Sequence, residues 1–523
     1  MSGAASGEDE KKGGEVVFAG HASWSMLGKN SKTSNFDGVE NQLLWGFQRL
    51  KPLVGIKVTK VISGPNSGTC IALSATGQAY TWGRNMHGQL GHGHQTNLYN
   101  PTPVEVPNSE SIIGGGAGPN HTLLYSARGS LFAAGLGKSG QLGIGRKVDM
   151  VKKFVTVDIA SVITAAACGR DFSIIVGSHG VIYSFGHPEK GVLGNGTEGK
   201  TLERSNKYTF ECTTRPEPIV ALQRAYGDVT ITDVACGAQH TCAMDTQGRI
   251  YTWGFGGFGR LGHGDNKDHF EPTAVELFSM EPPPLDPNIP KFMQNQQPKI
   301  RGTQITCGST STFVVAGEPY NSLYMFGITK RSGEATMRPV VENNVQGWRC
   351  RSVSCGNTSI CFASERKLIT WGPSPTYGEL GYGEGENIPR SSTVSKEVDA
   401  LSGALTLQVA SGMAFSLAII DTSDDTSKEK VEALPVFAPA EVDPALAKAA
   451  AQKSLEERRA KRAKNKTKAK RPANNEEDDE DDDAPIDVDD EDDDDASAGD
   501  DDDDDEEEEE EEEVKPKAKR RKK

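Results

Sequence analysis

The stretch "YTWGFGGFGRLGHG", from Tyr251 to Gly264, decides the fold. Through Gly254, Gly256 and Gly259 it matches G-x-G-x-x-G, the spacing of a loop that holds the phosphates of a dinucleotide. That fingerprint needs a strand before the loop and a helix after it. Here "RLGHGDNKDHFEP" follows, which is typical of a turn. The stretch therefore indicates a structural turn, and we expect no nucleotide cofactor.

Related stretches recur along the chain, and their recurrence carries the fold prediction. Upstream of each lies a small residue and a glycine before a short apolar run, as in "CGAQHTCAM". The fifth copy, "YMFGITKRSGEATMRP", lacks the usual x-Leu-Gly, so its strands are harder to assign. The other copies are "YTWGRNMHGQLGHG" from Tyr80, "FAAGLGKSGQLGIG" from Phe132, "YSFGHPEKGVLGNG" from Tyr183 and "ITWGPSPTYGELGYG" from Ile369.

Within each copy the residue pattern predicts strand, tight turn and strand. Large and small residues alternate, as in Tyr251 and Trp253 around Thr252, which is the period of a sheet with two different faces. Repeats of this kind, roughly 45 to 70 residues long, predict a β-propeller with one repeat per blade. The sequence thus predicts an all-β fold.

The two ends of the repeat region each hold half of a copy. "VASGMAFSLAII", at residues 409–420, has the first half, and "VVFAGHASWSMLGK", at residues 16–29, has the second. Together they complete one blade, so that six whole copies and one shared copy give seven. We expect the N-terminal segment to close the ring, which leaves no free strand edge at the seam.

The Cys/Ser-Gly, Trp-Gly and Gly-Gln-Leu-Gly pattern resembles the repeat of the regulator of chromosome condensation family, over about residues 15–430. Segments such as "FAGHASWSMLGK", "NQLLWGFQRL" and "WGPSPTYGELGYG" resemble one branch of that family most. The resemblance implies a seven-bladed propeller that binds Ras-superfamily small GTPases and contacts chromatin or mitotic structures during cell division. The alternative is an active guanine-nucleotide exchange factor for a GTPase of the Rac, Ran, Ral or Arf type.

The resemblance also implies partner-binding residues shortly after the first-strand glycine of a blade. The comparable residues here are Asp171 in "CGRDF", His240 in "CGAQHT" and His121 in "AGPNHT". The competing interpretation is that each hydrogen-bonds within the propeller. Nucleotide exchange needs no covalent chemistry, because the factor acts by binding one state of the GTPase more tightly. We accordingly predict no catalytic residue, and the long inserts at 195–230 and 278–303 are candidate partner loops.

Charge is concentrated beyond the repeats. Residues 476–513 contain 30 of the 73 acids and no base, whereas 453–471 and the last ten residues are basic. Such blocks cannot bury a core. Strong helix formers after Asp443 and Pro444 predict a basic helix. We expect a disordered N-terminus, a propeller, a linker, a basic helical segment and a disordered acidic tract with a basic end, at residues 1–14, 15–425, 426–442, 443–471 and 472–523.

The basic blocks predict nuclear import through an importin, with the nucleus as the main location and the cytoplasm or mitotic structures as others. The acidic tract predicts contact with histones or chromatin, and the alternative is a solubilising tail without a dedicated partner. The residues assigned to the import signals are Lys461, Arg462, Lys468, Lys470, Arg471, Lys517, Lys519, Arg520 and Arg521.

The remaining composition argues against several classes of site. There are nine cysteines and no C-x-x-C pair, so we expect reduced thiols without a zinc site. His92 and His94 share a loop but lack further ligands, and we predict no metal. No apolar run approaches the length of a membrane span, and the N-terminus has no signal-peptide core. We expect a monomeric propeller.

Overall fold

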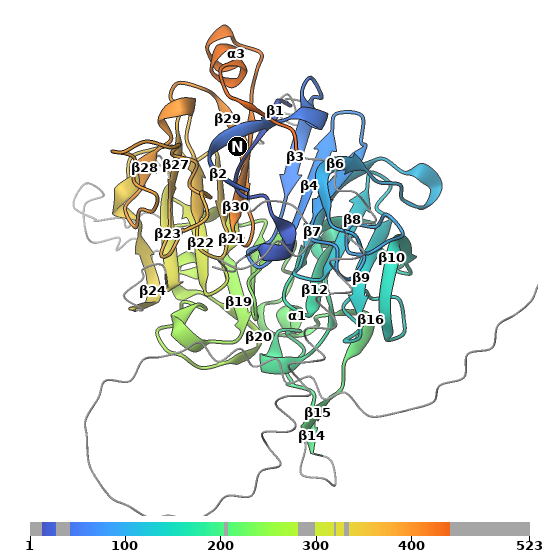
Figure 1. Cartoon of the computed structure of the whole chain (residues 1–523). Helices are drawn as coiled ribbons and strands as arrows, with labels where there is room; N and C mark the ends of the chain where they lie inside the picture. The colour runs from blue at the N-terminus through green and yellow to red at the C-terminus, as the bar shows by residue number, and fades with distance from the viewer. Residues whose placement is uncertain are drawn as a thin grey trace, which may run out of the picture. The chain divides into compact units, whose positions relative to one another are not determined.

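In the computed structural model, strands from the two ends of the repeat region meet in one ring of blades (Figure 1). Seven blade sheets of four or five strands make up the ring in the described part of the chain. The seven-bladed all-β prediction is confirmed. The structure describes residues 13–27, 42–202, 208–280, 299–317, 321–328 and 334–439.

Three whole blades follow one another in the first half of the ring, each with its strands antiparallel. The first consists of β3 (Val58–Ile62), β4 (Thr69–Ser74), β5 (Ala79–Gly83) and β6 (Leu98–Pro103). The second consists of β7 (Ile112–Ala117), β8 (His121–Ser126), β9 (Leu131–Gly137) and β10 (Val148–Val157). The third consists of β11 (Ile163–Cys168), β12 (Phe172–Gly177), β13 (Ile182–Gly186) and β16 (Thr213–Pro218).

Three more whole blades complete the second half. The fourth consists of β17 (Ile231–Cys236), β18 (His240–Asp245), β19 (Ile250–Gly254) and β20 (His269–Ala274). The fifth consists of β21 (Gly302–Cys307), β22 (Ser311–Ala316), β23 (Ser322–Ile328) and β24 (Ala335–Val341), and so is regular despite its missing x-Leu-Gly. The sixth consists of β25 (Ser352–Cys355), β26 (Ile360–Ala363), β27 (Leu368–Trp371) and β28 (Lys396–Glu397).

The seventh blade joins the two ends of the repeat region, as predicted. The strand β1 pairs antiparallel with β30 without a register shift, from Glu15 opposite Ile420 to Gly20 opposite Phe415. Figure 1 shows these first (blue) and last (orange) strands together. The sheet runs in the order β29 (Thr406–Ser411), β30 (Phe415–Ile420), β1 (Glu15–His21), β2 (Leu43–Leu50) and β31 (Val436–Phe437).

Residues assigned to a linker from 426 onward form ordered structure on the seventh blade. The helix α3 (Asp425–Glu432) begins at Asp424, whose side chain accepts a hydrogen bond from the Ser427 backbone N–H at 3.0 Å. The strand β31 then adds to β2 in parallel. Burial of Val431 and Leu434 explains why this segment packs rather than extends. The predicted helix beyond residue 443 lies outside the described residues.

The repeat glycines hold neighbouring backbones close together. A Cβ on Gly254 would lie 2.7 Å from the carbonyl oxygen of Gln239, and its φ of +102° is a conformation that L side chains rarely adopt. A Cβ on Gly237 would lie 2.7 Å from the carbonyl oxygen of Gly308 in the next blade. The opening stretch is therefore a structural turn, as its sequence context indicated.

Backbone hydrogen bonds run from blade to blade beside these glycines. The Arg170 N–H donates to Ala238 O at 3.1 Å, and the Ala238 N–H donates to Ser309 O at 3.4 Å. At the seam the Met413 N–H donates to Ser67 O at 3.0 Å, which joins the seventh blade to the first. The same contact thus recurs across the point where the ring closes.

Burial of the seam aromatics predicts a large cost for Phe18→Ala. The Phe18 ring is 1 % exposed and packs on Phe415 and Trp24, with ring centroids 5.6 and 6.1 Å away. We expect a loss of about 3–5 kcal/mol in the free energy of unfolding, measured by urea denaturation. Phe270→Ala, at a 37 % exposed ring, is the control. Equal losses for the two variants would contradict the role assigned to the seam.

Candidate interaction face

One face of the ring combines two kinds of loop. Because the strands of a blade alternate in direction, the turn between its first and second strands emerges on the same side as the loop between its third and fourth. We call this side the interaction face. It contains the turns with Asp171, His121 and His240, together with the x-Leu-Gly loops.

Two of the three predicted partner-binding residues are buried beneath this face. His121 and His240 have no exposed surface. His121 Nε2 lies 3.0 Å from Ser173 Oγ, and His240 Nε2 lies 3.0 Å from Thr312 Oγ1, each in the following blade. They therefore connect blades, and direct contact with a partner is not open to them in this conformation.

The hydroxyl partners indicate which nitrogen of each imidazole carries the proton. Ser173 Oγ donates to Gln141 O and Thr312 Oγ1 donates to Arg260 O, both at 2.8 Å. Each hydroxyl therefore accepts from the histidine Nε2–H. Burial lowers the pKa of His121 to about 4 and that of His240 well below the usual value, so both imidazoles are neutral at pH 7.

Asp171 reaches the surface of the interaction face. Its side chain is 36 % exposed, and Gln141 Nε2 donates to its carboxylate at 3.4 Å. Arg170 Nε lies 4.0 Å away. Burial raises the pKa of the Asp171 carboxyl, while the charge of Arg170 opposes that shift. Asp171 alone among the three can offer a partner a charged group.

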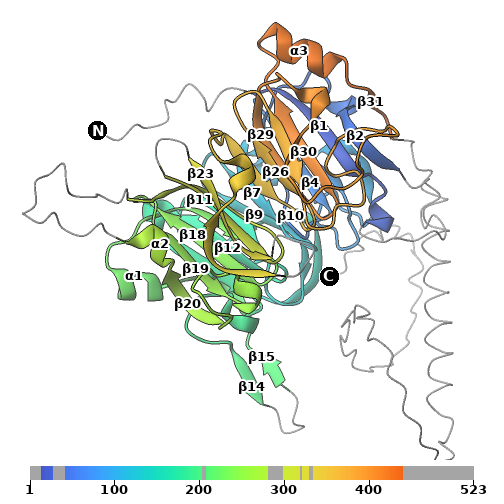
Figure 2. The same ribbon diagram turned by 90° about the vertical axis from the view of Figure 1, so that its left-hand side faces the viewer.

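A hairpin extends from the third blade on this face. It consists of β14 (Lys200–Leu202) and β15 (Tyr208–Phe210) and lies within the loop between β13 and β16. Leu202 and Tyr208 face each other across the hairpin and are both 59 % exposed. Figures 1 and 2 show it projecting from the ring. The insert at 195–230 was predicted as a partner loop, and an exposed apolar pair there suits protein contact.

A second exposed aromatic residue lies on the fourth blade, next to the third blade, which carries the hairpin. Phe258, in the x-Leu-Gly loop of the fourth blade, is 48 % exposed and has a φ of +63°. Lys190 has nearly the same φ, +64°, at the equivalent position of the third blade, so this conformation belongs to the repeat turn, and the exposed ring is what is particular to Phe258. Arg260 lies beneath, 5.6 Å from the Phe258 ring centroid and 4.6 Å from that of Phe255. Sequence reading missed Phe258, because the loop glycines gave no sign of its exposure.

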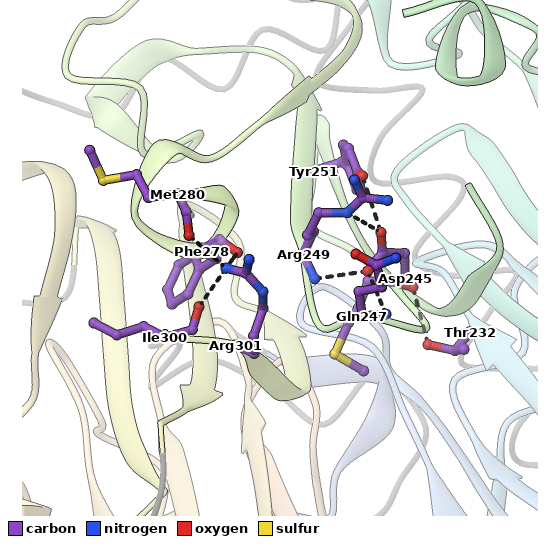
Figure 3. A network of polar contacts seen from close by, with 10 residues as sticks. Thr232, Asp245, Gln247, Arg249, Tyr251, Phe278, Met280, Ile300 and Arg301 are labelled. Atoms are coloured by element: carbon purple, nitrogen blue, oxygen red, sulfur yellow. Dashed lines mark hydrogen bonds and ion pairs between the residues drawn. The ribbon is translucent and has the colours of Figure 1, made fainter. Parts of the chain in front are cut away.

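The other candidate partner loop, at 278–303, leaves the opposite side of the fourth blade. Its residues 281–298 lie outside the described part, but the two ends meet at Arg301 (Figure 3). Arg301 Nη1 donates to the carbonyls of Phe278, Met280 and Ile300 at 2.5, 3.3 and 3.1 Å. The short helices α2 (Glu276–Ser279) and α1 (Ala221–Tyr226) lie on this side (Figure 2).

A separate ion pair holds the β18–β19 turn in the same region (Figure 3). Asp245 accepts from Arg249 Nε at 2.6 Å and from Tyr251 Oη at 3.2 Å. The turn N–H groups of Gln247 and Arg249 also donate to its carboxylate. These contacts show that the "DTQGR" turn, at residues 245–249, is structural.

Several predicted features stay outside what the structure tests. All the residues assigned to nuclear import lie beyond residue 439, outside the described chain. The described residues contain no cluster of three His, Cys, Asp or Glu side chains suited to a metal ion, and no helix long and apolar enough to cross a bilayer. All nine cysteines are free thiols, and burial raises the pKa of four that precede the repeat glycines: Cys168, Cys236, Cys307 and Cys355.

The fold and its repeat glycines define a propeller of the regulator of chromosome condensation class. Models of the regulator of chromosome condensation (RCC1) repeat match residues 76–125, 179–244, 247–315 and, in a second version, 231–260. Human Protein RCC2 is 37 % identical over 443 residues, which cover 83 % of this chain and 81 % of the human protein. The chain belongs to the Protein RCC2 family, which confirms the expected family and branch.

Solved structures agree on the fold. Yeast RCC1 (Prp20), in its complex with Kap60, superposes with a TM-score of 0.60 at 19 % identity and covers 82 % of this chain and 96 % of its own. Prp20p from Saccharomyces cerevisiae alone gives 0.59 at 19 % identity, covering 82 % and 98 %. At this identity the likeness supports the propeller and leaves the partners open.

The buried imidazole of His121 predicts a loss of stability in mild acid. Its pKa of about 4 lies below the ordinary 6.5, so the unfolded chain takes up the proton first as pH falls. The stabilisation is complete above pH 6.5 and disappears toward pH 4. We expect His121→Asn to remove about 2 kcal/mol of the decline between pH 6.5 and 5, measured by urea unfolding.

His179→Asn, at an exposed histidine, is the control for this pH dependence. The test compares slopes against pH, since the cavity in His121→Asn lowers stability at every pH. An unchanged slope in His121→Asn would contradict the neutral buried state.

Proposed function

We propose that this protein binds a Ras-superfamily small GTPase through the interaction face and contacts chromatin or mitotic structures, and so links GTPase signalling to cell division. The observation that supports this most is the projecting β14–β15 hairpin, whose exposed Leu202 and Tyr208 stand on the same side of the ring as Asp171 and Phe258. Rigid blades that display mobile or varied loops are a common design for protein recognition.

Two yeast findings support the kind of partner. Prp20 forms a complex with Kap60, and its binding to Gsp1p and to histones has been characterised. By analogy, we propose partners of the same kinds for this chain: a small GTPase on the propeller, histones or chromatin through the tail, and an importin on the basic blocks. Nuclear localisation follows from the same proposal.

The arrangement of groups on the face favours binding over chemistry. The exposed groups that this proposal uses are two aromatic rings, one aliphatic side chain and one carboxylate, from Tyr208, Phe258, Leu202 and Asp171. Such groups recognise a surface, and aromatic anchors supply most of the affinity in protein interfaces. Nucleotide exchange would require only that the face bind the empty GTPase better than the loaded one. A measurement of both GTPase binding and GDP release is therefore needed to distinguish a binding protein from an exchange factor.

The first test measures both quantities with the full chain. Rac-, Ran-, Ral- and Arf-type GTPases are loaded with fluorescent GDP, and binding and release are followed. We expect at least one GTPase to bind, and Tyr208→Ala with Phe258→Ala to weaken it about tenfold or more, because truncated aromatic anchors commonly cost 2 kcal/mol. Val220→Ala, at an exposed side chain near α1, is the matched control.

The outcomes have distinct meanings. Accelerated release that the double variant loses would identify an exchange factor. Binding without acceleration would identify a scaffold. No binding across the panel, or equal loss in the control, would overturn the GTPase part of the proposal.

A further inference from the structure

Exposed cations gather on the second blade. Arg146, Lys147, Lys152 and Lys153 follow one another from the β9–β10 loop into β10, and all four are exposed. In the described part of the chain, none has an acidic side chain within ion-pair distance. Together with Lys138 and Arg215, which are also exposed, these four residues form what we call the basic surface.

A bulge in β10 explains how two adjacent lysines both face solvent. Successive residues of a regular strand point to opposite sides. The pairing of β10 with β9 shifts between Val151 and Val155, which oppose Gly135 and Ala133. The extra residues let Lys152 and Lys153 both project outward, while Phe154 turns into the core at 4 % exposure.

Contacts with both neighbouring blades make this surface continuous. On one side the Gly145 N–H donates to Thr214 O at 2.8 Å, and a Cβ on Gly145 would lie 2.9 Å from the Arg215 guanidinium. On the other side the Gly93 N–H donates to Lys152 O at 2.8 Å. The positive charges therefore extend over the second and third blades, with Arg215 at one end and Lys152 and Lys153 against the first blade.

In the described part of the chain, one acid lies within ion-pair distance of these cations. Lys138 Nζ is 3.7 Å from Asp149, but the two side chains are 66 % and 83 % exposed, so water screens the pair. Burial is the largest cause that lowers the pKa of His87 nearby, and the positive charges of Arg84 and Lys138 lower it further. Both observations indicate a positive field above the second blade.

Several exposed cations elsewhere on the ring are paired with acids. Arg338 lies 2.9 Å from Glu276, Lys367 lies 2.8 Å from Glu397, and Arg224 pairs with Glu271. On the basic surface, five of the six cations have no such partner among the described residues, and they lie close together. Several dispersed, solvated cations suit a polymer of phosphates, whose charges repeat along its length.

We propose that the basic surface binds the phosphate backbone of a nucleic acid. Lys147, Lys152 and Lys153 contact successive phosphates without reading base sequence, and Arg146 and Arg215 extend the contact toward the third blade. This deepens the chromatin part of the proposed function: the propeller, and not the tail alone, contacts DNA. DNA binding is measured without a GTPase, so either part can fail separately.

The test measures binding of the full chain to a fluorescent DNA duplex of about 20 base pairs over a series of salt concentrations. We expect Lys147→Gln with Lys152→Gln and Lys153→Gln to reduce affinity about tenfold or more. The slope of log affinity against log salt should fall by about 2.7, since each lost phosphate contact removes about 0.9.

Two control variants separate this surface from other cations. Lys51→Gln with Lys57→Gln and Arg351→Gln removes three exposed charges elsewhere on the ring, and we expect wild-type affinity and slope. Lys468→Gln with Lys470→Gln and Arg471→Gln removes charges from the tail. The proposal is overturned if the basic-surface variant matches wild type or the ring control, or if only the tail variant loses binding.

A competitor decides between nucleic acid and an acidic protein. Unlabelled duplex and polyglutamate of equal charge are added to the DNA complex of the wild-type chain. Displacement by DNA at much lower concentration supports a phosphate site. Equal displacement by both would overturn the assignment to nucleic acid.

Discussion

The close approach of neighbouring blades at the repeat glycine is the constraint on which the rest of the structure depends. At Gly237 a single added carbon would lie 2.7 Å from the next blade's backbone. Without that carbon, the following N–H groups reach the next blade, as from Ala238 to Ser309 and from Met413 to Ser67. Each blade buries its faces only against its neighbours, so a single wide gap would expose core on both sides.

The same constraint explains why the interaction face is rigid underneath and varied on top. The buried imidazoles of His121 and His240 join blades below the surface, where neutral nitrogens satisfy hydroxyl groups. Above them the loops keep the backbone of the repeat but vary in side chain and length. The bulge of β10 recurs in the fourth strands of other blades, and the turn at Phe258 recurs at Lys190, so there only the exposed side chains are particular to the blade. The β14–β15 hairpin is an insertion between β13 and β16, and it exposes two apolar side chains.

The sequence predicted more of the fold than of the site. The seven blades, the shared seventh blade and the structural role of Gly254 followed from repeat spacing, because each glycine and aromatic answers a local backbone or packing need. His121 and His240 were placed on the interacting face by family likeness, yet their side chains are fully buried. Phe258 and the basic surface were not predicted, since neither exposure nor the absence of a nearby acid can be read along the chain.

By itself the sequence determined the blade count, the closure of the ring by its two ends and the family, because these depend on local periodicity and on glycines that tolerate a positive φ or a close backbone. It also determined where charge accumulates, since composition is a property of the chain alone. Tertiary structure decided which polar residues are buried and hydrogen-bond from one blade to the next, and which are exposed. Burial and pairing arise between blades far apart in the sequence, as between Gly145 and Arg215, and only the folded ring brings those residues together.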